Sequence, residues 1–185
     1  MRPLLQALRS LRQDRRGVSA VEFALIAPVL ILVYFGLAEL STGLTAKQRV
    51  SHATSAVGDL VAQADKPLST SDLDNIFTAA RTIVAPFPTA KLGLQVTSIT
   101  GDASGKPLVD WSDVSGTGLT KRKKNDPVDL PPGLIDEPGE TVIMAEATYA
   151  FDSPVGYVLP DGLVFNDHFY LRPRSAARVT CTDCS

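Results

Sequence analysis

An uncharged apolar run near the start of the chain constrains the fold more than any other feature. Residues 23–38 read FALIAPVLILVYFGLA and contain no charged side chain. The apolar stretch extends over residues 18–40, and a helix of that length is roughly 34 Å long, enough to cross the hydrocarbon core of a bilayer. A buried helix would need apolar partners on all sides, and the rest of the 185-residue chain is too small and polar to supply them. The run therefore predicts one membrane-spanning helix.

The charges that flank this run predict its orientation. Residues 1–17 carry five arginines and one acid, whereas Lys47 and Arg49 are the only bases that follow the run closely. Arginine-rich flanks stay on the cytoplasmic side of a membrane. We therefore expect a cytoplasmic leader over residues 1–17, a transmembrane helix over residues 18–40 and a periplasmic domain over residues 41–185.

The composition excludes several other classes of protein. With 44% hydrophobic and 21% charged residues the chain is neither disordered nor of low complexity, and its net charge of −2 gives no strong field for nucleic acid. The basic run KRKK at residues 121–124 has no interleaved aromatic residue, so we expect a solvated loop there and no nucleic-acid partner. Two separated histidines predict no metal site. We can assemble no set of nucleophile, base and orienting group, and we expect neither a catalytic site nor a cofactor.

Glu22 is the most informative single residue. A carboxylate near the membrane interior costs roughly 2.5–3.5 kcal/mol on insertion scales, which indicates a function with a partner. The alternative is that Glu22 lies at headgroup level, where this cost shrinks. Its surroundings, RRGVSAVEF at residues 15–23, combine a basic pair, a glycine, four small or apolar residues, the glutamate and an aromatic residue.

This pattern resembles the class III signal of type IV prepilins and pseudopilins, in particular that of the TadE-like (TadE/TadF) proteins of tight-adherence (Tad, Flp) pilus systems. The resemblance covers residues 15–40. It implies that a prepilin peptidase cuts between Gly17 and Val18 and that the apolar helix stays on the mature chain. Glu22 matches the glutamate of the family and Phe23 the aromatic residue after it.

The chemistry of this segment can be argued independently of the resemblance. A glycine before the scissile bond leaves room for a protease to approach the backbone. Cleavage creates an ammonium group on Val18, and Glu22 lies about one helical turn away from it. A buried carboxylate is tolerated when it is paired, so Glu22 would set the register of a subunit in a filament.

The resemblance also implies a function and a set of partners. It indicates a non-catalytic minor pseudopilin that initiates or joins a filament of a pilus or secretion machine, in the service of adhesion. The implied partners are the prepilin peptidase, other Tad pseudopilins and pilins, the inner-membrane assembly platform and membrane lipid. The choice between TadE and TadF stays open. The alternative is an uncleaved, single-pass periplasmic binding or sensor protein with the same anchor.

Two helices are expected around and after the membrane. An apolar series at spacings of mostly three and four residues predicts that the first helix continues as an amphipathic helix to Lys66 and Pro67. Ser71 is the predicted N-cap of a second helix that ends near Val84. Pro28 lies inside the span and predicts either a kink or a tolerated membrane proline. The residues of the apolar series are Leu40, Leu44, Val50, Ala53, Val57, Leu60 and Ala64.

Four segments with a period of two predict a small antiparallel sheet. They are residues 91–99 and 108–114, joined by a turn at residues 101–105, then residues 141–151, and residues 169–180 as an edge strand because of Pro173. Helices followed by antiparallel strands indicate an α+β domain. This plan is compatible with the pilin-like fold that the resemblance implies.

Cys181 and Cys184 form a C-x-x-C motif. Only Ser185 follows it, so we expect no helix that would lower a thiol pKa, and no further residues lie at zinc-ligand spacing. In an oxidising periplasm the motif predicts a small structural disulfide with a modest stabilising effect.

Overall fold

The computed structural model describes residues 17–154, 156, 159 and 162–184, so most of the predicted leader lies outside the described residues. In chain order its helices and strands are α2 (Val18–Ala62), α3 (Thr70–Val84), the short 3-10 helix η2 (Thr89–Lys91), β1 (Leu92–Gly101), β2 (Pro107–Ser115), β3 (Thr141–Phe151) and β4 (Leu163–Leu171).

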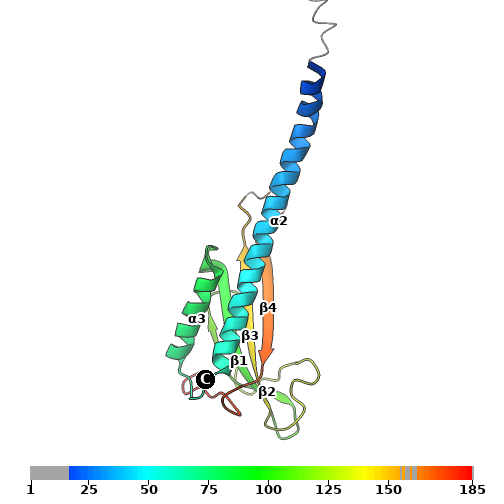
Figure 1. The fold of residues 1–185 in the computed structure, drawn as a ribbon. Coiled ribbons are helices and arrows are strands. Elements are labelled where there is room, and N and C mark those ends of the chain that lie inside the picture. Colours follow the sequence, from blue (N-terminus) through cyan, green and yellow to red (C-terminus); the bar gives the residue numbers. More distant parts are fainter. Residues whose placement is uncertain (1–16, 155, 157–158, 160–161, 185) are drawn as a thin grey trace, which may run out of the picture.

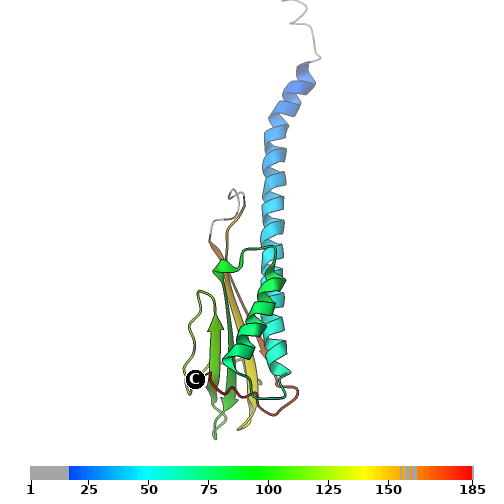
Figure 2. The same ribbon diagram turned by 90° about the vertical axis from the view of Figure 1, so that its left-hand side faces the viewer.

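The strands form one antiparallel sheet in the order β2-β1-β3-β4. Helices α2 and α3 cover one face of it side by side, and the first half of α2 projects beyond the domain as a stalk (Figures 1 and 2). The predicted α+β class is confirmed, as are the hairpin of β1 with β2 and the strand over residues 141–151. The predicted inward face of β3, which runs in alternate residues from Ile143 to Phe151, contributes to the hydrophobic core.

Helix α2 is one continuous helix of 45 residues that passes through Pro28 without a break. Its domain half buries a stripe at three- and four-residue spacing, which matches the predicted one at Val50, Ala53 and Val57 and differs from it at the leucines. Leu40, Leu44 and Leu60 are 45%, 53% and 45% exposed. The buried positions are smaller residues, and small side chains let the helix lie close to the sheet. They are Gly43, Ala46, Val50, Ala53, Thr54, Val57, Gly58, Val61 and Ala62, and Glu39 is a larger buried side chain of the same helix.

The predicted N-cap of α3 was wrong by two residues. Ser69 is the cap: its hydroxyl accepts from the amide of Asp72, while the Asp72 carboxylate accepts from the amide of Ser69. Ser71 also has an aspartate, Asp74, three residues later, so this spacing alone does not distinguish the two serines. The helix begins at Thr70, which places Ser71 inside its first turn. At the other end of α3, Arg49 of α2 donates to the carbonyl oxygens left free as the helix ends.

The connection between β2 and β3 was expected to be a solvated loop. Instead, its first part crosses the outer face of the sheet. Gln95 of β1 donates to the carbonyl of Thr120 at 3.0 Å, and Arg122 forms a two-pronged ion pair with Glu146 of β3. Lys121 lies 3.7 Å from Asp113 of β2. Because the connection lies across the outer face of the sheet, Lys121 and Arg122 of the basic run are placed beside acids of the strands, which partly neutralise the run.

The last predicted strand was placed too late in the chain. β4 runs from Leu163 to Leu171, and only three residues of the predicted segment 169–180 belong to it. Pro173 lies beyond the strand. The residues after it cross the end of the domain opposite the stalk and approach the start of α3 (Figure 1).

Candidate assembly segment and its support

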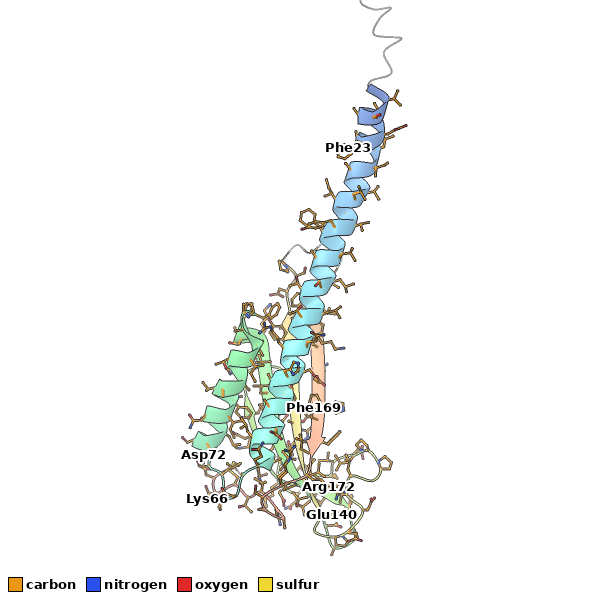
Figure 3. The ribbon with its side chains drawn as sticks, viewed as in Figure 1. Phe23, Lys66, Asp72, Glu140, Phe169 and Arg172 are labelled. Atoms are coloured by element: carbon orange, nitrogen blue, oxygen red, sulfur yellow. A yellow bond between two sulfur atoms is a disulfide. The ribbon has the colours of Figure 1, made fainter. Side chains whose placement is uncertain are left out.

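The projecting half of α2 has an apolar surface that the domain does not cover. None of residues 18–38 is buried, and Phe23 and Leu25 are 68% and 72% exposed. Figure 3 shows the side chains of the stalk, Phe23 among them, pointing outward from the helix. Within the described part of the chain this is the helix long and apolar enough to cross a membrane, with a mean hydropathy of 2.3 in its most apolar window.

Gly17 immediately precedes this helix and has an ordinary backbone conformation. Its φ of −78° and ψ of −15° are accessible to any residue. A Cβ atom added there would meet no described atom within 4 Å beyond its chain neighbours. The fold of the described chain therefore does not require glycine at this position. Gly58 in the domain differs, because a Cβ atom there would lie 2.5 Å from Leu171 Cδ1.

The four residues inferred to govern processing lie together at the free end of the stalk. Val18 begins α2, and Glu22 lies four residues later on the same helix, with Phe23 next to it. All of them are exposed. Among the residues that the structure describes, Glu22 has no ion-pair partner.

Glu39 supports the base of the stalk and was not singled out from the sequence. Its side chain is 2% exposed, and its Oε1 atom accepts from the amide of Gly156 at 2.7 Å and from the hydroxyl of Ser153. These donors come from the connection between β3 and β4, more than a hundred residues along the chain. A lone carboxylate at the end of an apolar run was visible in the sequence, but nothing in the pattern indicated its partner.

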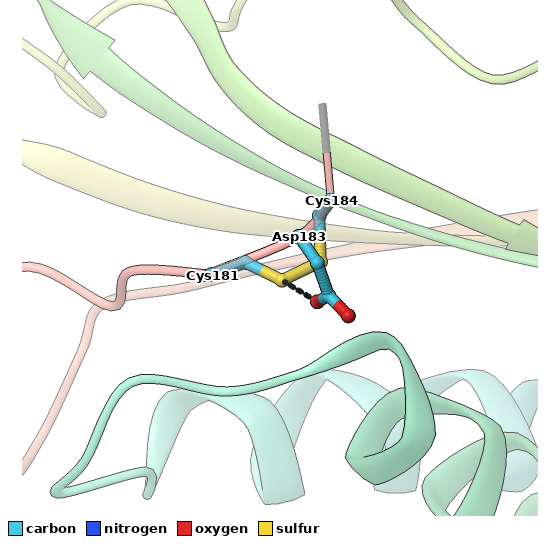
Figure 4. Close-up of side chains that lie close together, drawn as sticks. All are labelled: Cys181, Asp183 and Cys184. Atoms are coloured by element: carbon cyan, nitrogen blue, oxygen red, sulfur yellow. Dashed lines mark hydrogen bonds between the residues drawn. A yellow bond between two sulfur atoms is a disulfide. The ribbon is translucent and has the colours of Figure 1, made fainter.

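The C-terminal segment closes the opposite end of the domain. Cys181 and Cys184 are joined by a disulfide with a Cα–Cα distance of 5.6 Å, so their sulfur atoms are not available as metal ligands. Asp183 between them points toward the first turn of α3 (Figure 4), and its Oδ1 atom lies 3.6 Å from the Cys181 sulfur. Nothing in the sequence indicated this contact, because the start of α3 comes from a distant part of the chain.

Together these features define an α+β domain that carries a long helix with an exposed apolar half, a candidate membrane anchor. Residues 17–59 match the TadE-like protein family, so this part of the chain is TadE-like, as its sequence indicated. The match includes Gly17, Val18, Glu22 and Phe23, and it associates the chain with proteins of the Tad pilus. Comparisons with curated proteins and with solved structures give no match.

Proposed function

We propose that this chain is a minor pseudopilin of a Tad pilus machine, a substrate of a prepilin peptidase rather than an enzyme. The peptidase cuts between Gly17 and Val18, and the apolar half of α2 then holds the subunit in the inner membrane until it joins or initiates a filament. Its partners are the peptidase, other pilins and pseudopilins, the assembly platform and membrane lipid. The leader faces the cytoplasm and the α+β domain faces the periplasm.

The observation that carries this proposal is the contrast between Gly17 and the packing of the chain. Gly17 has a backbone conformation open to any residue and free space around its Cα, so neither strain nor packing accounts for glycine there. A protease that must approach the backbone closely does account for it. The TadE-like match begins at this same residue.

The anchoring step follows from the exposed surface of the stalk. Each large apolar side chain that moves from water into lipid contributes roughly 1.5–3 kcal/mol, and the stalk carries many of them. Glu22 is the one charged side chain within residues 18–38, and its transfer into lipid is unfavourable. Cleavage creates an ammonium group on Val18 one helical turn away, and this cation offsets the cost of the carboxylate.

The intact mass of the protein extracted from its native envelope tests the proposal. A pseudopilin lacks residues 1–17 and begins at Val18. The variant Gly17→Arg should remain uncleaved, because a long cationic side chain obstructs access to the bond, and it should unfold at the same temperature as the parent, because the added side chain meets no described neighbour. A parent chain that still begins at Met1 would overturn the proposal and favour an uncleaved single-pass binding or sensor protein.

A further inference from the structure

Two opposite charges are isolated on the exposed surface of α2. Between residues 18 and 48 the charged side chains are Glu22, Glu39 and Lys47, and Glu39 is buried. Neither Glu22 nor Lys47 forms an ion pair with another residue in the part of the chain that the structure describes. The next base, Arg49, is engaged by backbone carbonyls at the end of α3.

Their spacing places both charges on one side of the helix but far apart along it. Glu22 and Lys47 are 25 residues apart, the difference of their numbers in the sequence. At 3.6 residues and 5.4 Å per turn this is roughly seven turns and roughly 37 Å. A whole number of turns returns the second side chain to the direction of the first. The two charges therefore share a face, and they cannot reach each other within one chain.

Lys47 lies at a shallow apolar groove beside this face. The groove has a volume of about 90 Å³ and is lined by Leu40, Gly43 and Leu44 of α2 and by Leu163 and Phe165 of β4, with Lys47 as its charged member. It continues the apolar surface of the stalk, since Leu37, Leu40 and Leu44 are 62%, 45% and 53% exposed. An apolar helix with one carboxylate matches this surface in both hydrophobicity and charge.

We propose that Glu22 of one copy pairs with Lys47 of a second copy that is displaced by roughly 37 Å along the axis of α2. Residue n of the first copy then lies level with residue n + 25 of the second, so the first turn of the stalk, residues 18–22, lies at the groove beside Gly43, Leu44 and Lys47 of the second. Helical association of this kind buries apolar surface on both copies, and the ion pair fixes the displacement. A carboxylate has two acceptor oxygens, so Glu22 can accept from Val18 of its own chain as well as from Lys47.

This inference rests on the proposed function and makes it more specific. Two copies inserted in the bilayer to the same depth keep these charges apart by about the thickness of the hydrocarbon core. The pair forms only after one copy has moved along the membrane normal relative to the other. The Glu22–Lys47 pair is therefore expected in assembled subunits and not between subunits that lie at the same depth in the membrane.

A zero-length carbodiimide, which joins a carboxylate to an amine in direct contact, tests the pair. Full-length protein is treated in native envelopes and in detergent-dispersed form, and cross-linked peptides are identified by mass spectrometry. We expect a peptide joining Glu22 to Lys47 in the envelopes and its loss on dispersion, and any such link must join two copies. The variant Lys47→Arg should keep the assembly and lose the link, since a guanidinium does not couple in this way.

Charge reversal provides the second arm. Lys47→Glu should abolish the assembled species without any effect on processing, because the substitution is remote from Gly17, whereas Lys47→Arg keeps the positive charge and should keep the assembly. Intact mass is recorded for every variant. A chain that is processed normally but whose Glu22 links to another protein, or whose Lys47→Glu variant assembles like the parent, overturns the inference alone. A chain that is not processed overturns the proposed function, and the inference with it.

Discussion

Asp183 caps the start of α3 from the other end of the chain. Its two carboxylate oxygens accept from the amide and from the hydroxyl of Thr70, each at 2.8 Å, across 113 residues of sequence. Thr70 is the first residue of α3, so the acid lies where the free amides and the helix dipole favour negative charge. The disulfide on either side of Asp183 holds the carboxylate in this position.

Acid should destabilise this end of the domain. Hydrogen bonds from Thr70 lower the pKa of Asp183, and those from Ser69 lower the pKa of Asp72. A lowered pKa in the folded state means that the stabilising contribution is present above the ordinary carboxyl pKa and is lost as the pH falls through the folded value. We expect the unfolding temperature to fall below about pH 4, the ordinary aspartate range, with a smaller fall in Asp183→Asn.

Asp113 provides the internal control for this pH dependence. Burial raises its pKa, with Lys121 acting in the opposite direction. A raised pKa contributes stability below the unfolded value and loses it as the pH rises through the folded value, so Asp113→Asn should leave the acid-induced loss at least as steep as in the parent. An equal flattening of the profile by Asp183→Asn and Asp113→Asn would contradict the assignment to Asp183.

Removal of the disulfide should loosen α3 before it affects the sheet. In the double variant Cys181→Ala, Cys184→Ala, loss of the cross-link that closes this short loop should lower the free energy of unfolding by about 2 kcal/mol on the chain-entropy model. The segment stays attached through Trp111, whose indole nitrogen donates to the carbonyl of Val179 at 2.9 Å. Amide hydrogen exchange should therefore increase at the first turn of α3 and much less in β1. A uniform increase across the domain would show that the disulfide acts globally.

The sequence was sufficient for those parts of the fold that depend on local periodicity. The strand over residues 141–151 was predictable because its alternate residues face one core. The long apolar helix was predictable because residues 23–38 carry no charge. The choice of the buried face of α2 was not predictable from hydrophobicity. Leu40 and Leu60 are more apolar than Gly43 and Gly58, yet the glycines face the sheet, because close approach of the helix requires small residues there.

The residues of the candidate site and its support also separate into those that the sequence could indicate and those that it could not. Gly17 and Glu22 could be proposed as processing residues because the pattern that contains them is contiguous in sequence and lies within the TadE-like match. Glu39 and Asp183 could not, since each acts on a group more than a hundred residues away. The ion pair of Arg122 with Glu146 was not predicted for the same reason, since it depends on the connection between β2 and β3 crossing the outer face of the sheet.

A methyl group at Gly58 should be costly although alanine favours a helix. A Cβ there would lie 2.5 Å from Leu171 Cδ1 and 3.1 Å from Ala145 Cβ. Overpacking of this kind costs about 1–3 kcal/mol, against a gain of about 1 kcal/mol in helix propensity. We expect Gly58→Ala to lower the free energy of unfolding. The matched control is Gly17→Ala, which has free space and should leave it unchanged; a stabilised Gly58→Ala would show that Leu171 moves aside at little cost.

Glu39 should prove to be the residue that joins the stalk to the domain. In Glu39→Leu the donors Ser153 and Gly156 lose their charged acceptor, and hydrogen bonds to charged groups contribute about 1.5–3 kcal/mol each before rehydration of the donors offsets part of the loss. We expect faster hydrogen exchange at Gly156 and a lower unfolding free energy in detergent. Glu39→Gln keeps an acceptor oxygen at the same distance and should retain most of the protection. If Gln and Leu are equally damaging, the negative charge itself is required; if neither has an effect, the stalk is held by the packing of Gly43 and Ala46 alone.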